Sequence, residues 1–255
     1  MGTVVTIEVA RPDADQAIAA AFGWFHDIET QCTRFNPKSE LSQLVAQPGI
    51  PFSASAILFE AVRFALTVAE ASGGAFDPTR TSAGYRDIEL DPEQMTITLR
   101  RPVTLDLGAV AKGLAIDTAA RELQPLEDFA IDAGGDLYLG GRNPRGEPWS
   151  VGIGHPRRER ELIRTLRLSN QAVCTSGDYE RGRHILDPRT GEPADLVSSA
   201  TVVAPSAMLA DALATAAFVL GPDHGIEFLE RMGVEGLIFT PDLRCFETGW
   251  LSDVE

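Results

Sequence analysis

The stretch "HILDPRTG", residues 184–191, holds side chains that can do acid–base chemistry. His184 carries an imidazole, which in its neutral form can take a proton from a hydroxyl near pH 7. Asp187 could orient that ring, or it could cap the turn at Pro188 and Arg189. An isolated histidine beside a turn is more often structural than catalytic. The stretch taken alone therefore leaves both interpretations open.

A second stretch, "PSAMLADALATAAFVLGP" (205–222), places one carboxylate on an apolar helix. Asp211 is the only charged residue from Ala207 to Leu220, and a helix that is apolar on nearly every face is a buried one. A buried carboxylate is costly unless it is paired or bound to a metal. Thr215 follows one turn later on the same face, and two hard oxygens suit Mg²⁺. The alternative is that Asp211 caps a neighbouring loop and Thr215 bonds to a carbonyl of its own helix.

A third stretch, "VTLDLGAVAKGLAID" (103–117), reads as a strand that turns into a helix. The strand ends at Asp106, and the helix begins at about Ala109. The free N–H groups of a first helical turn favour an anion. Lys112 lies close to that turn, where a cation opposes the helix dipole, so an anionic partner such as a phosphate is indicated. The alternative is an exposed lysine at an ordinary turn.

Two glycine-containing stretches are ambiguous in the same way. They are "SGGAFDPTR" (72–80) and "AIDAGGDLYLGG" (130–141). Consecutive glycines let a backbone approach a ligand closely or adopt positive φ. A glycine-containing β-turn is the commoner explanation of such a stretch taken alone.

The elements that must position these residues follow from hydrophobic periodicity. It predicts helices over 13–32, 55–72, 109–123 and 207–220, a short helix capped by Ser39, a hairpin arm over 96–107, and strands near 4–9, 129–141, 149–156, 164–177, 198–205 and 236–240. Helices and strands do not alternate strictly. An α+β fold with a mixed or antiparallel sheet is therefore predicted in preference to a doubly wound parallel sheet.

Composition excludes several classes of protein. A chain of 255 residues, 44% of them hydrophobic, can bury the core of one large domain or of two closely packed halves. Its net charge of −15 disfavours nucleic acid and anionic lipid as partners. Cys32, Cys174 and Cys245 lack metal-site spacing and are expected to be reduced thiols. No apolar segment approaches about 20 residues and no signal-peptide pattern is found, so we expect a cytoplasmic protein without membrane insertion.

Taken in order, the motifs "MGT…RFNPKSELSQL…SGGAFDPT…LDLGAVAKG…DAGGDLYLGG…TSGDYE…HILDPRTG…ADALATA" resemble the ApbE family of FAD:protein FMN transferases. The resemblance extends from Met1 to about Leu220. It implies one α+β, T-fold-like domain over residues 1–255, built from two related halves with flanking helices, and FAD in the cleft between the halves. It also implies Mg²⁺-dependent transfer of FMN from FAD to a Thr or Ser hydroxyl of an acceptor protein, with release of AMP. An FAD pyrophosphatase that yields FMN and AMP, and a non-catalytic FAD-binding protein, are the alternatives.

The same resemblance implies roles for individual residues. Metal ligands are expected at Asp211, Thr215 and the main-chain oxygen of Ala109. His184 and Asp106 are the candidate catalytic residues, with His184 as the base. The residues expected to contact FAD are Met1, Phe35, Ala75, Phe76, Asp77, Asp106, Lys112 and Ile185. The connection after "FDP" (79–87) and the connection before "HILDP" (179–184) are short compared with those of many relatives, which leaves the identity of the acceptor open.

Overall fold

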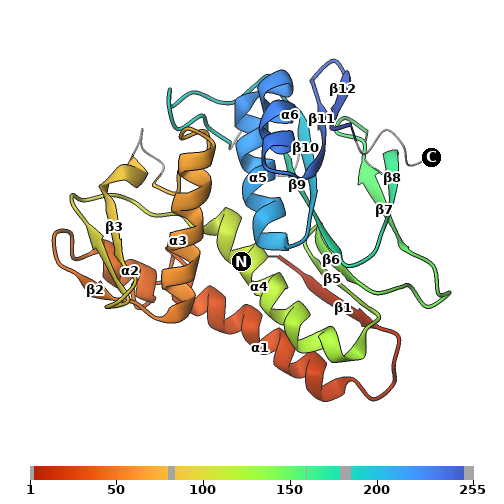
Figure 1. Cartoon of the computed structure of the whole chain (residues 1–255), viewed down its shortest axis with the longest axis horizontal. Coiled ribbons are helices and arrows are strands. Elements are labelled where there is room, and N and C mark those ends of the chain that lie inside the picture. Colours follow the sequence, from red (N-terminus) through yellow and green to blue (C-terminus); the bar gives the residue numbers. More distant parts are fainter. Residues whose placement is uncertain (1–2, 80–83, 159, 179–184, 250–255) are drawn as a thin grey trace.

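A seven-stranded sheet forms the framework of the molecule (Figure 1). The computed structural model describes residues 3–79, 84–158, 160–178 and 185–249. Within these residues, every pairing between the strands of the sheet is antiparallel. In spatial order its strands are β1 (Val5–Val9), β5 (Phe129–Ala133), β6 (Asp136–Gly140), β9 (Gln171–Gly177), β10 (Ser199–Ala204), β11 (Glu235–Phe239) and β12 (Cys245–Glu247). The predicted α+β class is confirmed, with an antiparallel sheet.

The two faces of this sheet are covered differently. One face packs against helices, and the other packs against a two-stranded hairpin of β7 (Trp149–Gly154) and β8 (Leu162–Leu168) (Figure 1). Most contacts with this face come from α4 (Gly108–Leu123), α5 (Ala207–Leu220) and α6 (Pro222–Arg231). The other helices, α1 (Asp15–Cys32), α2 (Glu40–Val45) and α3 (Ala56–Ala71), pack mainly against helices. A separate three-stranded sheet contains β2 (Phe52–Ser53), β4 (Thr96–Leu99) and β3 (Ile88–Asp91). Short 3₁₀ helices span Gly84–Asp87 and Gln124–Leu126.

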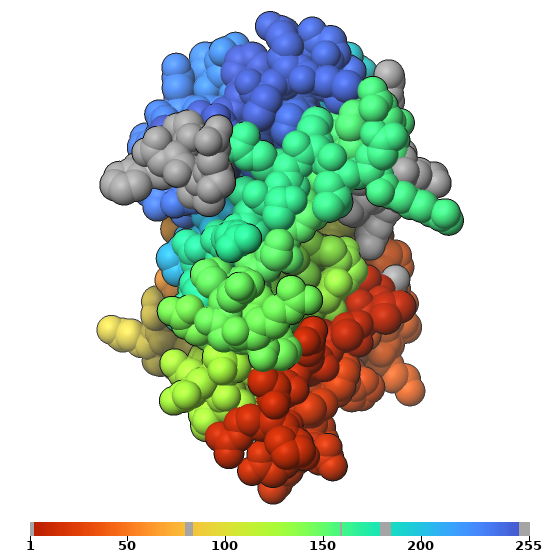
Figure 2. All heavy atoms as spheres, turned by 90° about the vertical axis from the view of Figure 1, so that its right-hand side faces the viewer, coloured from red at the N-terminus to blue at the C-terminus, as the bar shows by residue number. Residues whose placement is uncertain are grey.

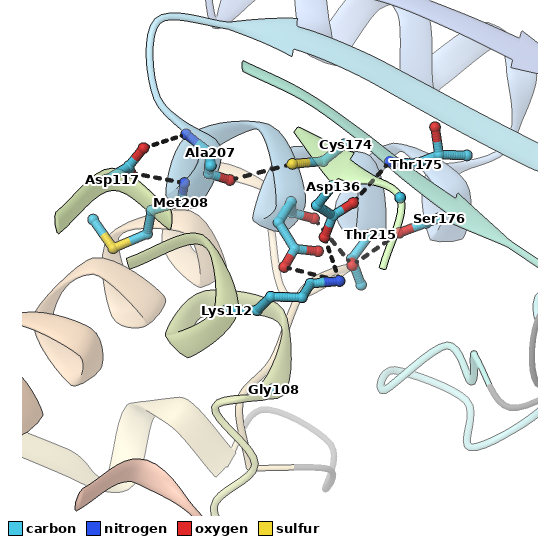
Figure 3. A network of polar contacts seen from close by, with 12 residues as sticks. Gly108, Lys112, Asp117, Asp136, Cys174, Thr175, Ser176, Ala207, Met208 and Thr215 are labelled. Atoms are coloured by element: carbon cyan, nitrogen blue, oxygen red, sulfur yellow. Dashed lines mark hydrogen bonds and ion pairs between the residues drawn. The ribbon is translucent and has the colours of Figure 1, made fainter. Parts of the chain in front are cut away.

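The crossing of α4 and α5 fixes the relative position of the site residues on these helices. A Cβ on Gly113 would lie 2.4 Å from Cα of Met208, so only glycine allows the two backbones to approach this closely. Asp117 of α4 then accepts the N–H groups of Ala207 (2.6 Å) and Met208 (2.9 Å) at the start of α5 (Figure 3). Burial raises the pKa of Asp117 to about 6, although these two bonds act to lower it. The predicted helix 207–220 is confirmed, and its first turn is anchored to α4.

The predicted N-terminal cap at Ser39 is observed, and Ser55 caps α3 in the same way. The hydroxyl of Ser39 accepts the N–H of Ser42 at 3.1 Å, and the hydroxyl of Ser55 accepts the N–H of Leu58 at 3.2 Å. The helix predicted from Ser55 therefore begins one residue later, with the serine as its cap.

Three local predictions were wrong or incomplete. The hairpin arm expected over 96–107 ends at Leu99, and 100–107 crosses to α4 without being a strand. The sequence also did not reveal α6, which begins at Pro222 only one residue after α5 ends. Proline at the first helical position starts a new helix as readily as it ends an old one. The three-residue strand β12 was too short to produce a periodic pattern.

None of the helices described here has both the length and the apolar composition required to cross a membrane.

Candidate functional site

A cavity of about 960 Å³ opens where the helices meet the end of the sheet. Its walls come from the C-terminal end of α1, the first turns of α4, the end of β9, one face of α5 and the segment 185–191. Every predicted site residue that the structure describes lines it, namely Phe35, Ala75, Phe76, Asp77, Asp106, Ala109, Lys112, Ile185, Asp211 and Thr215. Met1 and His184 lie outside the described residues. The structure thus brings together residues that are distant in sequence, while their individual roles stay predictions.

A lysine between two buried carboxylates forms the polar centre of the cavity (Figure 3). The ammonium of Lys112 forms an ion pair with Asp136 and lies 3.8 Å from Oδ2 of Asp211. Burial acts to lower the pKa of Lys112, but the two carboxylates outweigh it and raise the pKa above its usual value. The lysine is therefore charged at neutral pH. Neither sequence-based interpretation of Lys112 foresaw this arrangement, because its anionic partners in the structure are carboxylates of the protein.

Asp136 is a site residue that the sequence analysis missed. Its side chain is buried, and its Oδ1 accepts the N–H of Thr175 at 3.3 Å. The stretch 130–141 was interpreted for its glycines, one of which is needed because a Cβ on Gly134 (φ +67°) would lie 1.9 Å from Oγ1 of Thr3. A carboxylate directly after this turn, at the start of a buried strand, was the signal available.

The proposed metal ligands offer hard oxygens beside the polar centre of the cavity. Asp136 and Asp211 place two carboxylate groups next to the ammonium of Lys112. The hydroxyl of Thr215 donates to the main-chain oxygen of Asp211 at 3.2 Å, as the alternative interpretation expected, and lies 3.2 Å from the hydroxyl of Ser176. Carboxylate and hydroxyl oxygens of this kind suit Mg²⁺.

A magnesium ion in this cavity would have few charged protein ligands. Among the residues that the structure describes, no group of three or more His, Cys, Asp or Glu side chains could hold a metal. A magnesium ion here would depend on one carboxylate, on hydroxyl and main-chain oxygens, and on the oxygens of a bound substrate. This is how proteins commonly hold Mg²⁺ next to phosphates. The residues present therefore fit the ion.

A second polar group surrounds the start of α4. Asp106 accepts the N–H of Gly108 at 3.0 Å, and its Oδ2 lies 3.1 Å from Nε of Arg34. The guanidinium of Arg34 in turn lies 4.2 Å from the ring centroid of Phe35, whose side chain is 80% exposed. Arg34 was not recognised in the sequence, although it directly precedes the predicted aromatic residue. It places a cation and an aromatic ring together at one wall of the cavity.

The segment 185–191 forms another part of the cavity wall. Asp187 accepts the main-chain N–H of Arg189 at 2.9 Å and forms an ion pair with its guanidinium at 2.7 Å. These hydrogen bonds hold the pKa of Asp187 below its usual value. Asp187 therefore caps the turn, as one of the two interpretations expected, while any contact with His184 lies outside the described residues. Ile185 packs against the hydrophobic core and lines the cavity.

Comparison with known proteins gives consistent results. The family model of the ApbE family matches residues 1–83 and 79–238. A relative from Treponema pallidum, named FAD:protein FMN transferase, is 31% identical over an alignment that covers 99% of this chain and 86% of the relative. A Haemophilus influenzae protein of the same name is 35% identical, and the match covers 58% of this chain and 47% of that protein's length. The crystal structure of the ApbE protein from Thermotoga maritima superposes with a TM-score of 0.90 at 27% identity, covering all of this chain and 96% of that one.

Proposed function

The chain belongs to the ApbE family, and we propose that it transfers the FMN part of FAD to a threonine or serine hydroxyl of an acceptor protein. In this reaction the hydroxyl oxygen bonds to the phosphorus on the FMN side of the pyrophosphate. The bond from that phosphorus to the bridging oxygen breaks, AMP leaves, and the hydroxyl proton passes to a base. The observation that carries the proposal is that one cavity is lined by all of the described residues that the resemblance assigned to FAD and the metal.

The cavity has the size and the chemistry for a dinucleotide. Its volume of about 960 Å³ lies at the upper end of the usual range for ligand pockets. The exposed ring of Phe35 offers a surface for an aromatic ring system. The helix dipole at the first turn of α4 favours phosphate oxygens, and Arg34, which also pairs with Asp106, adds a guanidinium at the same wall of an otherwise acidic chain.

Divalent metal dependence is part of the proposal. Asp211, Thr215 and the main-chain oxygen of Ala109 would hold a magnesium ion, which when bound neutralises charge on the pyrophosphate oxygens. The ammonium of Lys112 is shared between Asp136 and Asp211. Because Asp136 also holds the lysine, Asp211 would still be able to bind the metal ion. Lys112 then contributes a second positive charge beside the reacting phosphates.

We assign proton removal from the attacking hydroxyl to His184. The basis is the sequence motif "HILDPRTG", in which His184 directly precedes the segment 185–191 that lines the cavity. Asp106 already accepts a main-chain N–H and pairs with Arg34, contacts that suit it to hold the start of α4 in place. Use of water instead of a protein hydroxyl would make the same site an FAD pyrophosphatase, and product analysis distinguishes the two.

FAD is expected to stabilise the folded protein, whereas NAD and ATP are not. A ligand that binds only the native state adds about 2.7 kcal/mol at a concentration 100 times its Kd, so the melting temperature should rise steadily with FAD concentration. Differential scanning fluorimetry without added acceptor measures this directly. The variant Phe35→Ala should need more FAD for the same shift, and Phe22→Ala, an exposed aromatic residue outside the cavity, should behave like the wild type. Stabilisation by NAD or ATP with no response to FAD would contradict the assignment.

A further inference from the structure

A second groove, of about 510 Å³, lies on the hairpin side of the sheet. Figure 2 shows the molecule from this side, with the β7–β8 hairpin facing the viewer. The groove runs between β7 and the face of β1, β5, β6 and β9 that carries no helix. No role in the proposed reaction uses this groove.

The floor of the groove consists of side chains from paired strands. Thr6 pairs with Asp132, and Asp132 pairs with Leu137 on the next strand. The adjacent row contains Glu8, which is exposed, and Ala130. Two carboxylates, those of Glu8 and Asp132, therefore lie in an otherwise neutral floor.

The wall of the groove is an unpaired strand edge. Among the described residues, β7 pairs only with β8. Every second residue of an antiparallel strand directs its N–H and C=O away from its partner, so β7 presents a row of backbone donors and acceptors to the groove. Ser150, Gly152 and Gly154 all line the groove and have small side chains or none. An accessible edge of this kind is a template for an added strand.

One end of the groove meets the main cavity. Thr175 lines both spaces, and Gly135, which precedes the buried Asp136, lines the groove. The turn after β7 is fastened at this same end, because Arg157 forms a bidentate pair with Asp178 just beyond β9, at 2.7 and 2.8 Å. A polypeptide lying along β7 would therefore reach the cavity that holds Lys112 and Asp211.

We propose that this groove binds an extended segment of the acceptor protein, which adds a strand to β7 and places a lysine or arginine over Glu8 and Asp132. Main-chain hydrogen bonds to β7 supply affinity, and the two carboxylates select basic side chains. The identification of the partner as the acceptor protein rests on the proposed function. The binding of an extended basic segment to this groove does not depend on that function.

Peptide binding to the FAD-free protein tests the groove without requiring any reaction. The probes are fluorescein-labelled octapeptides of alternating Thr and Lys, or of alternating Thr and Glu, measured by fluorescence anisotropy. We expect the Thr–Lys peptide to bind at least about 10-fold more tightly, since like charges across an interface are unfavourable. Amide hydrogens of β7 should become protected from exchange when the Thr–Lys peptide binds, which a merely electrostatic surface contact would not cause.

Substitutions in the groove test whether the peptide binds there. Glu8→Arg should weaken binding of the Thr–Lys peptide about 5-fold or more, and Thr6→Trp should block the groove with a side chain that strands tolerate. The matched controls are Glu93→Arg, in the turn between β3 and β4, and Thr165→Trp, on the exposed face of β8; both should bind like the wild type. Equal binding of the two peptides, or unchanged binding by Glu8→Arg and Thr6→Trp, would overturn the proposal. Peptide binding as predicted, in a protein that never transfers FMN, would instead refute only the proposed function.

Discussion

Asp211→Asn is expected to lower the rate of FMN transfer by about 10²- to 10³-fold while the protein stays folded. Stabilisation of phosphate charge by a bound metal amounts to several kcal/mol, and each 1.36 kcal/mol corresponds to a factor of ten in rate. Asparagine keeps the shape of aspartate but loses the charge. The fold should tolerate the change because Lys112 retains its ion pair with Asp136.

Two further measurements separate loss of metal from loss of structure. Isothermal titration with Mg²⁺ should show weakened binding by Asp211→Asn, with a melting temperature near that of the wild type. Asp223→Asn, the same substitution at an exposed position on α6 outside the cavity, should change neither binding nor rate. If the Asp211 variant and EDTA-treated wild type both transfer FMN at the normal rate, the metal assignment is wrong.

His184→Ala is expected to slow transfer by about 10²- to 10⁴-fold, the usual contribution of a general base. The wild-type rate should fall at low pH, because a charged imidazole cannot accept the proton. The affinity for FAD should change far less than the rate, since the ring would contact the acceptor hydroxyl more than the cofactor. Single-turnover rates and FAD titrations on the same preparation measure the two effects separately.

The competing explanation is that His184 only holds the segment that places Ile185 at the cavity wall. In that case FAD binding should weaken in parallel with turnover, and the pH dependence of the remaining rate should be unchanged. If His184→Ala binds FAD normally and also transfers FMN at the normal rate, the base would instead be Asp106 or another carboxylate near the cavity.

Helix α5 shows how far the sequence could predict the site. Its apolar composition predicted a buried helix over 207–220 that presents Asp211 and Thr215 together, and this is observed. These features are local, because caps, periodicity and i, i+4 spacing are set within a few turns of chain.

Contacts between segments that are distant in the chain could not be predicted from the sequence in this way. The partners of Lys112 are Asp136 on β6 and Asp211 on α5, and only the packing of α4 against both places them together. Arg34, just after α1, lies beside Asp106, just before α4, because these two helices also pack together. The charge type of each residue was visible in the sequence, but the pairing depends on the sheet order, which periodicity does not encode.

In the proposed reaction, FMN leaves FAD for a protein hydroxyl. The most direct measurement is intact-mass spectrometry of a threonine-containing candidate acceptor protein after incubation with the enzyme, FAD and Mg²⁺, with AMP quantified in the same sample. We expect one FMN attached to a Thr or Ser per AMP released, and neither product when Mg²⁺ is omitted. Free FMN and AMP in equal amounts from an acceptor that stays unmodified, or FAD that remains intact, would contradict it.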